Sequence, residues 1–138
     1  MNNYKLLDFK KIGFQDVGYL TPLEGQKDIP FEIKRVYYIY DVPNDVKRGF
    51  HAHKKLEQVL VCVNGSVTIH VEDAKTKEKF VLDDPHKGLY IGPRVWREMT
   101  DFYPNSVFLA IVSRPYEEED YIRDYKEFEA KYKNHDSK

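Results

Sequence analysis

The chain of 138 residues contains a single cysteine, Cys62, so no disulfide can form within it. This cysteine stands inside an apolar segment, where a free thiol usually behaves as a small buried hydrophobic side chain. A chain without an internal disulfide fits a reducing compartment, and we therefore expect a cytoplasmic protein.

Long apolar runs are also absent, and residues 1–14 are too polar for a signal peptide or a membrane anchor. Charged side chains make up 33% of the chain, yet the formal net charge is only −1. This balance produces no global field that would attract nucleic acid or a membrane surface. We expect neither of them as a partner.

No repeat, low-complexity tract or linker rich in proline or glycine divides the sequence. Its length suits one domain whose core is large enough to be stable without disulfides or metals. We therefore interpret residues 1–138 as a single domain.

Most of the apolar segments have the β-branched and aromatic composition of strands. Turn-forming residues separate these segments, and the pair Asn64-Gly65 favours a type I′ hairpin between the strands on its two sides. The expected strands are 31–40, 57–63, 66–72, 79–82, 88–91 and 106–112.

Only residues 118–133 have the apolar spacing of a helix, with Tyr121, Tyr125 and Phe128 on one face. Acidic residues stand near its start and lysines near its end, as the helix dipole favours. Many short strands followed by one terminal helix are typical of an all-β antiparallel barrel or jelly roll.

The segment 49–65, GFHAHKKLEQVLVCVNG, is the most informative part of the chain. His51 and His53 are two residues apart at the start of an apolar strand, so their imidazoles share one face. Histidine is also the side chain best suited to moving protons near neutral pH. The segment is similar to the first motif of cupins, G-x5-H-x-H-x3,4-E-x6-G, in which two histidines and a glutamate bind a metal.

Two ligand positions of the cupin motifs are changed in this chain. The spacing places Gln58 at the glutamate position, because the alternative, Glu57, leaves one residue too many before the glycine. The second motif is best matched by IGPRVWREM, in which Arg97 replaces the last histidine ligand. A guanidinium is always protonated and has no free lone pair, so it cannot bind a metal. We expect no metal site and no other cofactor.

Four segments together resemble the sugar 3,4-ketoisomerases, which act on dTDP-4-oxo-6-deoxyglucose in pathways to 3-amino-3,6-dideoxyhexoses. These segments are DIPFEIKRVYYIYDV, RGFHAHKKLEQVLVCVNGSV, GLYIGPRVWREM and EEEDYIRDY, and the resemblance covers residues 20–125. It implies a cupin-type barrel, a metal-independent isomerase, a dTDP-linked 4-keto-6-deoxy sugar as substrate and a homodimer. Lipopolysaccharide or another surface glycan is the implied destination of the amino sugar.

The resemblance makes His51 the expected catalytic base and His53 its partner in proton handling. Arg97 and Tyr37 are candidates for stabilising a negative oxygen, which is usually the largest catalytic contribution. A buried structural histidine, a packed tyrosine and a surface salt bridge are the alternatives for these side chains.

Binding a nucleotide requires cations for two phosphates and a flat surface for thymine. Arg35, Arg48 and Lys54 lie in or near the resembling segments and are candidate phosphate ligands, with a solvated surface position as the alternative. Gln58 should point inward, where it can hydrogen-bond sugar or base. Trp96 could stack on the substrate or close the pocket, although core packing is the favoured alternative.

Some members of the resembling family carry histidine where this chain has Arg97. The residue is therefore a candidate for deciding which face of C4 receives the proton, and we expect the gluco product, with the galacto product as the alternative. Two other functions stay open: a dTDP-sugar 3,5-epimerase and a non-catalytic cupin that binds sugar nucleotides.

Overall fold

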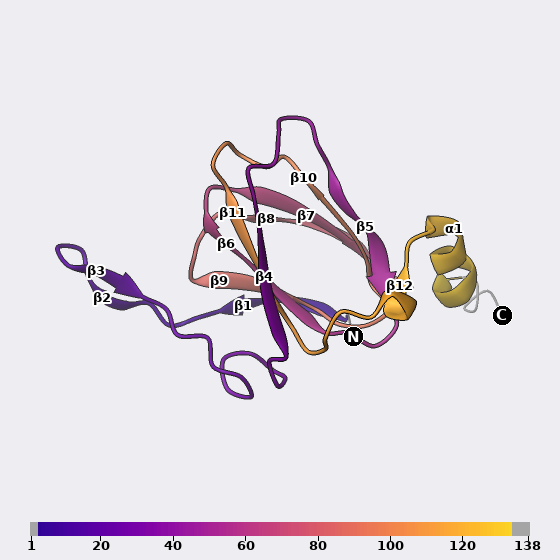
Figure 1. Cartoon of the computed structure of the whole chain (residues 1–138), viewed down its shortest axis with the longest axis horizontal. Helices are drawn as coiled ribbons and strands as arrows, with labels where there is room; N and C mark the ends of the chain where they lie inside the picture. The colour runs from indigo at the N-terminus through magenta and orange to yellow at the C-terminus, as the bar shows by residue number, and fades with distance from the viewer. Residues whose placement is uncertain (1–2, 134–138) are drawn as a thin grey trace.

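Two antiparallel sheets of five strands each form the body of the computed structural model, which describes residues 3–133 (Figure 1). The first sheet has the order β1 (Tyr4–Asp8), β9 (Lys87–Ile91), β6 (Gln58–Asn64), β11 (Val107–Val112) and β4 (Arg35–Tyr40). The second has the order β12 (Tyr121–Ile122), β5 (Arg48–His53), β10 (Trp96–Thr100), β7 (Val67–Glu72) and β8 (Lys77–Leu82). A separate hairpin, β2 (Ile12–Phe14) with β3 (Gly18–Leu20), extends away from this body (Figure 1).

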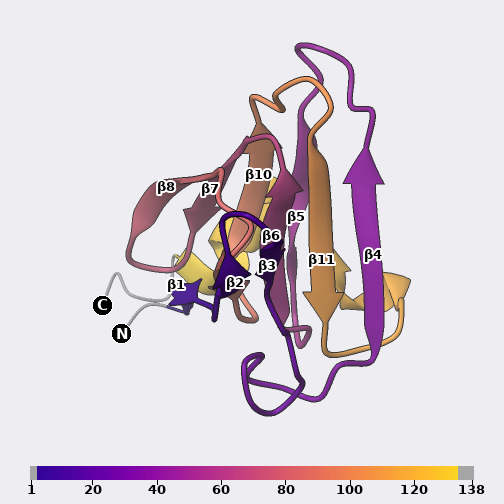
Figure 2. The same cartoon turned by 90° about the vertical axis from the view of Figure 1, so that its left-hand side faces the viewer.

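All six strands expected from composition are present, as β4, β6, β7, β8, β9 and β11, with shifted ends. The largest shift is in β4, which begins at Arg35, whereas residues 31–34 precede it without strand structure. The composition did not indicate β1, β2, β3, β10 or β12. An all-β antiparallel fold of two facing sheets is confirmed (Figure 2).

The hairpin expected at Asn64-Gly65 is wrong. β6 pairs with β9 and β11 in the first sheet, whereas β7 pairs with β8 and β10 in the second. Because both edges of β6 are occupied, the turn carries the chain from one sheet to the other. Gly65 has φ 87°, and a Cβ there would lie 2.2 Å from Ser106 Oγ, so the crossing requires glycine.

The histidine pair and Gln58 also belong to different sheets, contrary to the single strand expected from the sequence. His51 and His53 lie at the end of β5, residues 54–57 form the connection, and β6 begins at Gln58. The glutamine therefore approaches the histidines from the facing sheet.

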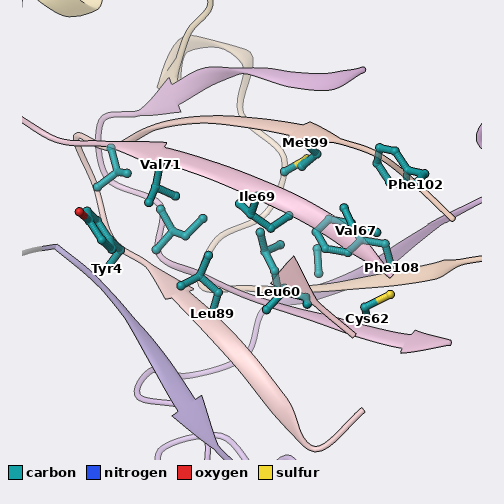
Figure 3. Close-up of a cluster of buried hydrophobic side chains, with 14 residues drawn as sticks. Tyr4, Leu60, Cys62, Val67, Ile69, Val71, Leu89, Met99, Phe102 and Phe108 are labelled. Carbon is teal, nitrogen blue, oxygen red and sulfur yellow. The ribbon is translucent and has the colours of Figure 1, made fainter. Parts of the chain in front are cut away.

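The inner faces of the two sheets enclose the largest hydrophobic cluster, part of which is shown in Figure 3. Leu60 and Leu89 of the first sheet pack with Ile69 and Val71 of the second, and all four are at most 1% exposed. Cys62 is buried in the same cluster as a free thiol, as expected. Burial of each such aliphatic side chain is worth roughly 1.5–3 kcal/mol.

The C-terminal segment covers the outer face of the second sheet, and its helix is shorter than the expected 118–133. A 3-10 turn, η1 (Glu118–Asp120), leads into β12, and helical structure begins with α1 (Tyr125–Phe128) and continues as a π-helical turn, η2 (Glu129–Lys133). The helix starts late because β12 pairs with β5. In the described part of the chain, none of the helices has the length and apolar character needed to cross a membrane.

Phe128 anchors this segment, because its side chain is fully buried against Trp96, Tyr125 and Tyr132. We predict that Phe128→Ala lowers the free energy of unfolding by about 3–5 kcal/mol, the usual cost of an aromatic-to-alanine cavity. Urea unfolding followed by fluorescence measures this change. Tyr103→Ala, at a side chain that is 67% exposed, is the control and should change stability by less than about 0.5 kcal/mol. Equal effects of the two substitutions would contradict the anchoring role.

Candidate active site

The inward-facing side chains of β4 and β5 line a cavity of about 270 Å³ between the two sheets. β10, β12 and the residue after β12 complete its wall. The lining residues are Arg35, Tyr37, Ile39, Arg48, Gly49, His51, Met99, Tyr121 and Arg123.

His51 and His53 lie side by side on the inner face of β5, as their spacing predicted, with ring centroids 4.8 Å apart. Strand pairing places Arg97 of β10 opposite His51 and Tyr121 of β12 opposite His53. The Tyr121 ring covers both imidazoles, at centroid distances of 5.0 Å and 4.4 Å. Three neighbouring strands thus bring a cation, two imidazoles and a phenol to one wall.

The ring of His51 is oriented by the backbone of its own strand. Gly49 accepts a hydrogen bond from the ring, whereas the buried Nε2 has no hydrogen-bond partner among residues 3–133. Burial, followed by the charge of Arg97, lowers the pKa of His51 from 6.5 to about 3. His51 is therefore neutral at pH 7, with Nε2 as a buried proton acceptor.

Gly49 also allows β5 and β10 to approach closely at this point. Its φ is 94°, and a Cβ there would lie 3.1 Å from the carbonyl oxygen of Arg97. The pairing register between the two strands shifts next to Arg97, as at a β-bulge. Bulges beside functional sites re-aim side chains, and this one accompanies the carbonyl of Gly49 that orients His51.

His53 is 1% exposed, and its Nδ1 lies 3.0 Å from Oδ2 of Asp120. Burial and the nearby Arg97 charge lower its pKa, so this imidazole is also neutral at pH 7. The two histidines thus differ in what their Nδ1 atoms face: a neutral carbonyl for His51 and a carboxylate for His53.

Arg97 is fully buried and makes both of its hydrogen bonds to neutral oxygens. Nη1 donates to Gln58 Oε1 at 2.5 Å and Nη2 donates to the Val95 carbonyl at 3.1 Å, while Nε has no partner in the described chain. Burial lowers the pKa of Arg97 to about 10, so it remains protonated at neutral pH. The barrel therefore contains a positive charge without a directly bonded anion.

A metal ion does not fit this set of residues. Arg97 offers no lone pair and carries positive charge, and it already uses the side-chain oxygen of Gln58. Within residues 3–133, no three carboxylate, thiol or imidazole side chains are grouped so that they could hold a metal. The arginine and the glutamine occupy the positions of two metal ligands in the cupin motifs.

Gln58 bridges the two sheets, because it connects Arg97 of the second sheet to Tyr37, which lies, like Gln58, in the first. It is 1% exposed, and its Nε2 donates to the Tyr37 hydroxyl at 3.0 Å. Burial raises the pKa of Tyr37, so the phenol keeps its proton at pH 7. Since its oxygen accepts from Gln58, its own proton is available to a group in the cavity. Tyr37 faces inward and its neighbour Tyr38 is 61% exposed, as side-chain alternation along a strand requires.

The structure brings two of the four other predicted binding residues to the cavity. Arg35 and Arg48 line it, and Arg35 also lies over the Tyr37 ring, with its guanidinium carbon 5.2 Å from the centroid. Lys54 lies in a different surface hollow, and Trp96 is buried under α1 with its indole N–H bonded to Glu98. Substrate contact by Lys54 and Trp96 is therefore not supported. Strand alternation explains why Trp96 points away from the cavity, because Arg97 points inward and adjacent side chains of a strand point to opposite faces.

The sequence interpretation missed the contribution of the C-terminal segment. Tyr121 and Arg123 line the cavity, and Asp120 contacts His53. Arg123 lies over the Tyr121 ring at 4.0 Å and forms two hydrogen bonds with Glu118, at 2.8 Å and 2.9 Å. These residues belong to EEEDYIRDY, one of the resembling segments, but interpreting it as a helix gave them no inward direction.

Fold and site together define a cupin-type barrel whose cavity wall holds two neutral histidines beside a buried arginine. The family model described as "FdtA: WxcM-like, C-terminal" matches residues 2–133. The chain therefore belongs to this family. A curated 3,4-oxoisomerase that is 51% identical and solved 3,4-ketoisomerases that are 40–50% identical identify it as a family of sugar 3,4-ketoisomerases, so the predicted enzyme class, an isomerase, is confirmed.

Two relatives named as 3,4-oxoisomerase or 3,4-ketoisomerase align with this chain over most of their length. TDP-4-oxo-6-deoxy-alpha-D-glucose-3,4-oxoisomerase of Aneurinibacillus thermoaerophilus is 51% identical over 124 residues, which are 90% of this chain and 88% of the relative. A variant of the Thermoanaerobacterium thermosaccharolyticum 3,4-ketoisomerase, solved with TDP-4-keto-6-deoxyglucose, is 48% identical, with TM-score 0.93 over 100% of this chain and 99% of that chain.

Campylobacter jejuni has two similar enzymes of known structure. The TDP-quinovose 3,4-ketoisomerase is 46% identical, with TM-score 0.87 over 93% of this chain and 98% of that chain. The TDP-fucose-3,4-ketoisomerase is 40% identical, with TM-score 0.86 over 94% and 96%. An epimerase of Mycobacterium tuberculosis shares the fold, at 17% identity, with TM-score 0.72 over 86% of this chain and 67% of that chain.

The lowered pKa of His51 predicts the pH dependence of the reaction. The parameter kcat/KM reports the ionisation of the free enzyme, and a base must be neutral to accept a proton. If His51 is the base that the sequence predicts, its pKa of about 3 means that kcat/KM should vary by less than about two-fold between pH 8 and pH 5. A decline with a midpoint near pH 6.5, the value of an unperturbed histidine, would contradict this assignment.

Proposed function

We propose that this enzyme converts dTDP-4-oxo-6-deoxyglucose into the dTDP-3-oxo-6-deoxyhexose, with His51 as the base. The observation that carries this proposal is the buried Nε2 of neutral His51, which has no hydrogen-bond partner within residues 3–133 and lies beside the buried cation Arg97. A base next to a fixed positive charge suits a reaction that creates a negative oxygen. The T. thermosaccharolyticum relative, which binds TDP-4-keto-6-deoxyglucose, supports the choice of substrate.

The reaction moves a carbonyl from C4 to C3 without a net change in oxidation state. The C4 carbonyl acidifies the hydrogen on C3, and His51 removes it as a proton. The electron pair of the C3–H bond forms the C3–C4 double bond of an enediolate, with negative charge on O4. Transfer of the proton from O3 to O4 and protonation at C4 then leave a ketone at C3 and a hydroxyl at C4.

The low pKa of free His51 is compatible with this role because the substrate changes its surroundings. The enediolate places negative charge close to the imidazolium that His51 becomes, so the two charges stabilise each other. Arg97 and the available proton of Tyr37 are already oriented, so they can stabilise the developing oxyanion without reorganisation. His53 is the second proton carrier.

Arg35 and Arg48 are the proposed ligands of the two phosphates. Both line the cavity, and a guanidinium can donate two parallel hydrogen bonds to a phosphate. Gln58 contributes by fixing Arg97 and Tyr37, since both of its amide atoms are engaged by these side chains.

We infer that the product has the gluco configuration. Arg97 cannot deliver a proton as readily as a histidine at the same position, because its pKa stays near 10. In a gluco sugar the hydrogens on C3 and C4 lie on opposite faces of the ring, so the gluco product requires that C4 is protonated on the face away from the base that took the proton from C3. The proposed donor is a water held in the site, and not the histidine wall on β5. The galacto product is the alternative.

The decisive experiment is proton NMR of dTDP-4-oxo-6-deoxyglucose with chelator-treated enzyme. In D2O we expect deuterium at C4 of a 3-keto product. In H2O a large diaxial coupling between the protons on C4 and C5 should identify the gluco product, and a small coupling would identify galacto. Exchange at C3 and C5 without carbonyl migration would indicate a 3,5-epimerase, and binding without exchange would indicate a non-catalytic cupin.

Substitution of the base separates chemistry from binding. We predict that His51→Asn lowers kcat by at least about 10³-fold, because the proton acceptor is lost, while the affinity for TDP stays within a few-fold. His86→Asn, which alters a histidine paired with Asp84 outside the cavity, is the matched control and should retain activity. Turnover by His51→Asn near the control rate would assign the base elsewhere.

A carbonyl at C3 is the group that an amino-transfer reaction consumes. We therefore place the enzyme before such a step, in the synthesis of a 3-amino-3,6-dideoxyhexose for lipopolysaccharide or another surface glycan. The single cysteine, which is buried as a free thiol, supports the proposed cytoplasmic location.

Exposed apolar side chains support a homodimer. The β2–β3 hairpin extends from the body and exposes Phe14 by 72% and Val17 by 77% (Figure 1). β4 is an edge strand, and its outward Tyr38 and Tyr40 are 61% and 59% exposed. An isolated two-stranded hairpin is marginally stable in water, and exposed edges with apolar side chains favour association.

We predict that the enzyme elutes as a dimer in size-exclusion chromatography with light scattering. The double variant Phe14→Glu/Val17→Glu should give a monomer at micromolar concentration, because it places charge in the apolar surface. Tyr103→Glu, also at an exposed aromatic residue, is the control and should remain dimeric. A monomeric wild type would overturn the proposal.

A further inference from the structure

We propose that Asp120 is the positioning residue for His53, and that the pair forms the second proton carrier of the site. Asp120 keeps the His53 proton on Nδ1, which leaves Nε2 to accept a proton, and it remains a carboxylate beside the imidazolium that results. This inference rests on the proposed function for its catalytic meaning, although the tautomer itself can be measured without substrate.

The contact between the two side chains is buried on both sides. His53 is 1% exposed and Asp120 is 7% exposed, with Nδ1 and Oδ2 3.0 Å apart. A carboxylate can only accept, so the imidazole must donate from Nδ1. Two backbone N–H groups also donate to this carboxylate, Lys55 at 2.8 Å and Leu56 at 3.2 Å. These donors fix its orientation.

The backbone holds the partners in place independently of their side chains. The N–H of Lys54 donates to the Asp120 carbonyl at 2.9 Å, and the residue after Asp120 pairs with His53 across β12 and β5. The Tyr121 ring then covers the imidazole. A contact held by strand pairing and by three hydrogen bonds to one residue is preorganised, as a proton carrier requires.

The two histidines consequently have different tasks. Burial and the charge of Arg97 disfavour the doubly protonated, cationic form of both imidazoles. At Nδ1 the ring of His51 faces only the neutral carbonyl of Gly49. His53 has a negative charge 3.0 Å away, which stabilises an imidazolium as it forms. His51 is thus suited to remove the C3 proton transiently, whereas His53 with Asp120 can hold the O3 proton until O4 takes it up.

Asp120→Asn removes the negative charge and lets an amide N–H face Nδ1, while the side chain stays nearly isosteric. We expect kcat to fall at least about 30-fold, within the range for losing a group that orients a catalytic or metal-bound histidine, with TDP affinity unchanged within two-fold. The matched control is Asp73→Asn, another buried carboxylate that accepts backbone N–H bonds, from Lys75 and Thr76, outside the cavity. It should have similar thermal stability and full activity.

Two further readouts distinguish positioning from a structural effect. Nitrogen-15 NMR of the imidazoles should show the proton of His53 on Nδ1 in the wild type and on Nε2 in Asp120→Asn. In D2O the variant should still exchange the C3 hydrogen of recovered substrate through His51, while conversion to the 3-keto product slows.

The proposal is overturned if wild-type His53 carries its proton on Nε2, whether or not the protein turns over this substrate. It also fails if Asp120→Asn is as active as Asp73→Asn, or if C3 exchange and product formation decline equally. A wild type with the expected tautomer but no isomerisation would instead overturn the proposed function.

Discussion

Arg97 carries a positive charge into the interior of the barrel, and the arrangement of the site depends on that charge. Its hydrogen bonds go to Gln58 and Val95, which are neutral, so the desolvation of the guanidinium is only partly offset. Burial, together with this charge, lowers the pKa values of His51 and His53 and keeps both neutral. The anionic intermediate of the proposed reaction would supply a counter-charge to this guanidinium.

The site uses both sheets because each provides what the other lacks. β5, β10 and β12 bring ionisable groups together on one wall, in a register fixed by strand pairing. β4 and β6 contribute Tyr37 and Gln58 on the opposite wall. Gln58 accepts a hydrogen bond from Arg97 and donates one to Tyr37, and these bonds fix the position of the guanidinium. The core packed between the same sheets holds the two walls at a constant separation.

Local patterns determined what the sequence could predict. The cupin motif correctly gave Gln58 an inward direction, and the family resemblance made Tyr37 and Arg35 candidates for the site, because both depend on short segments of sequence alone. Pairing between distant strands is not visible in such patterns, so the sheet crossing at Gly65 was mistaken for a hairpin. The helical spacing of 118–133 concealed β12 for the same reason: its partner, β5, lies some 70 residues earlier, a separation that the register of Tyr121 with His53 makes explicit.

The four residues between β5 and β6 acquire a meaning from this arrangement. Residues 54–57 connect the end of the histidine wall to Gln58 on the facing wall, and their backbone is held by Asp120 and by Ser113. The number of residues in this connection therefore sets the distance between the histidines of β5 and Gln58, which holds Arg97. The variable spacing of three or four residues in the cupin motif therefore determines the width of the cavity between the two sheets as well as the position of a ligand.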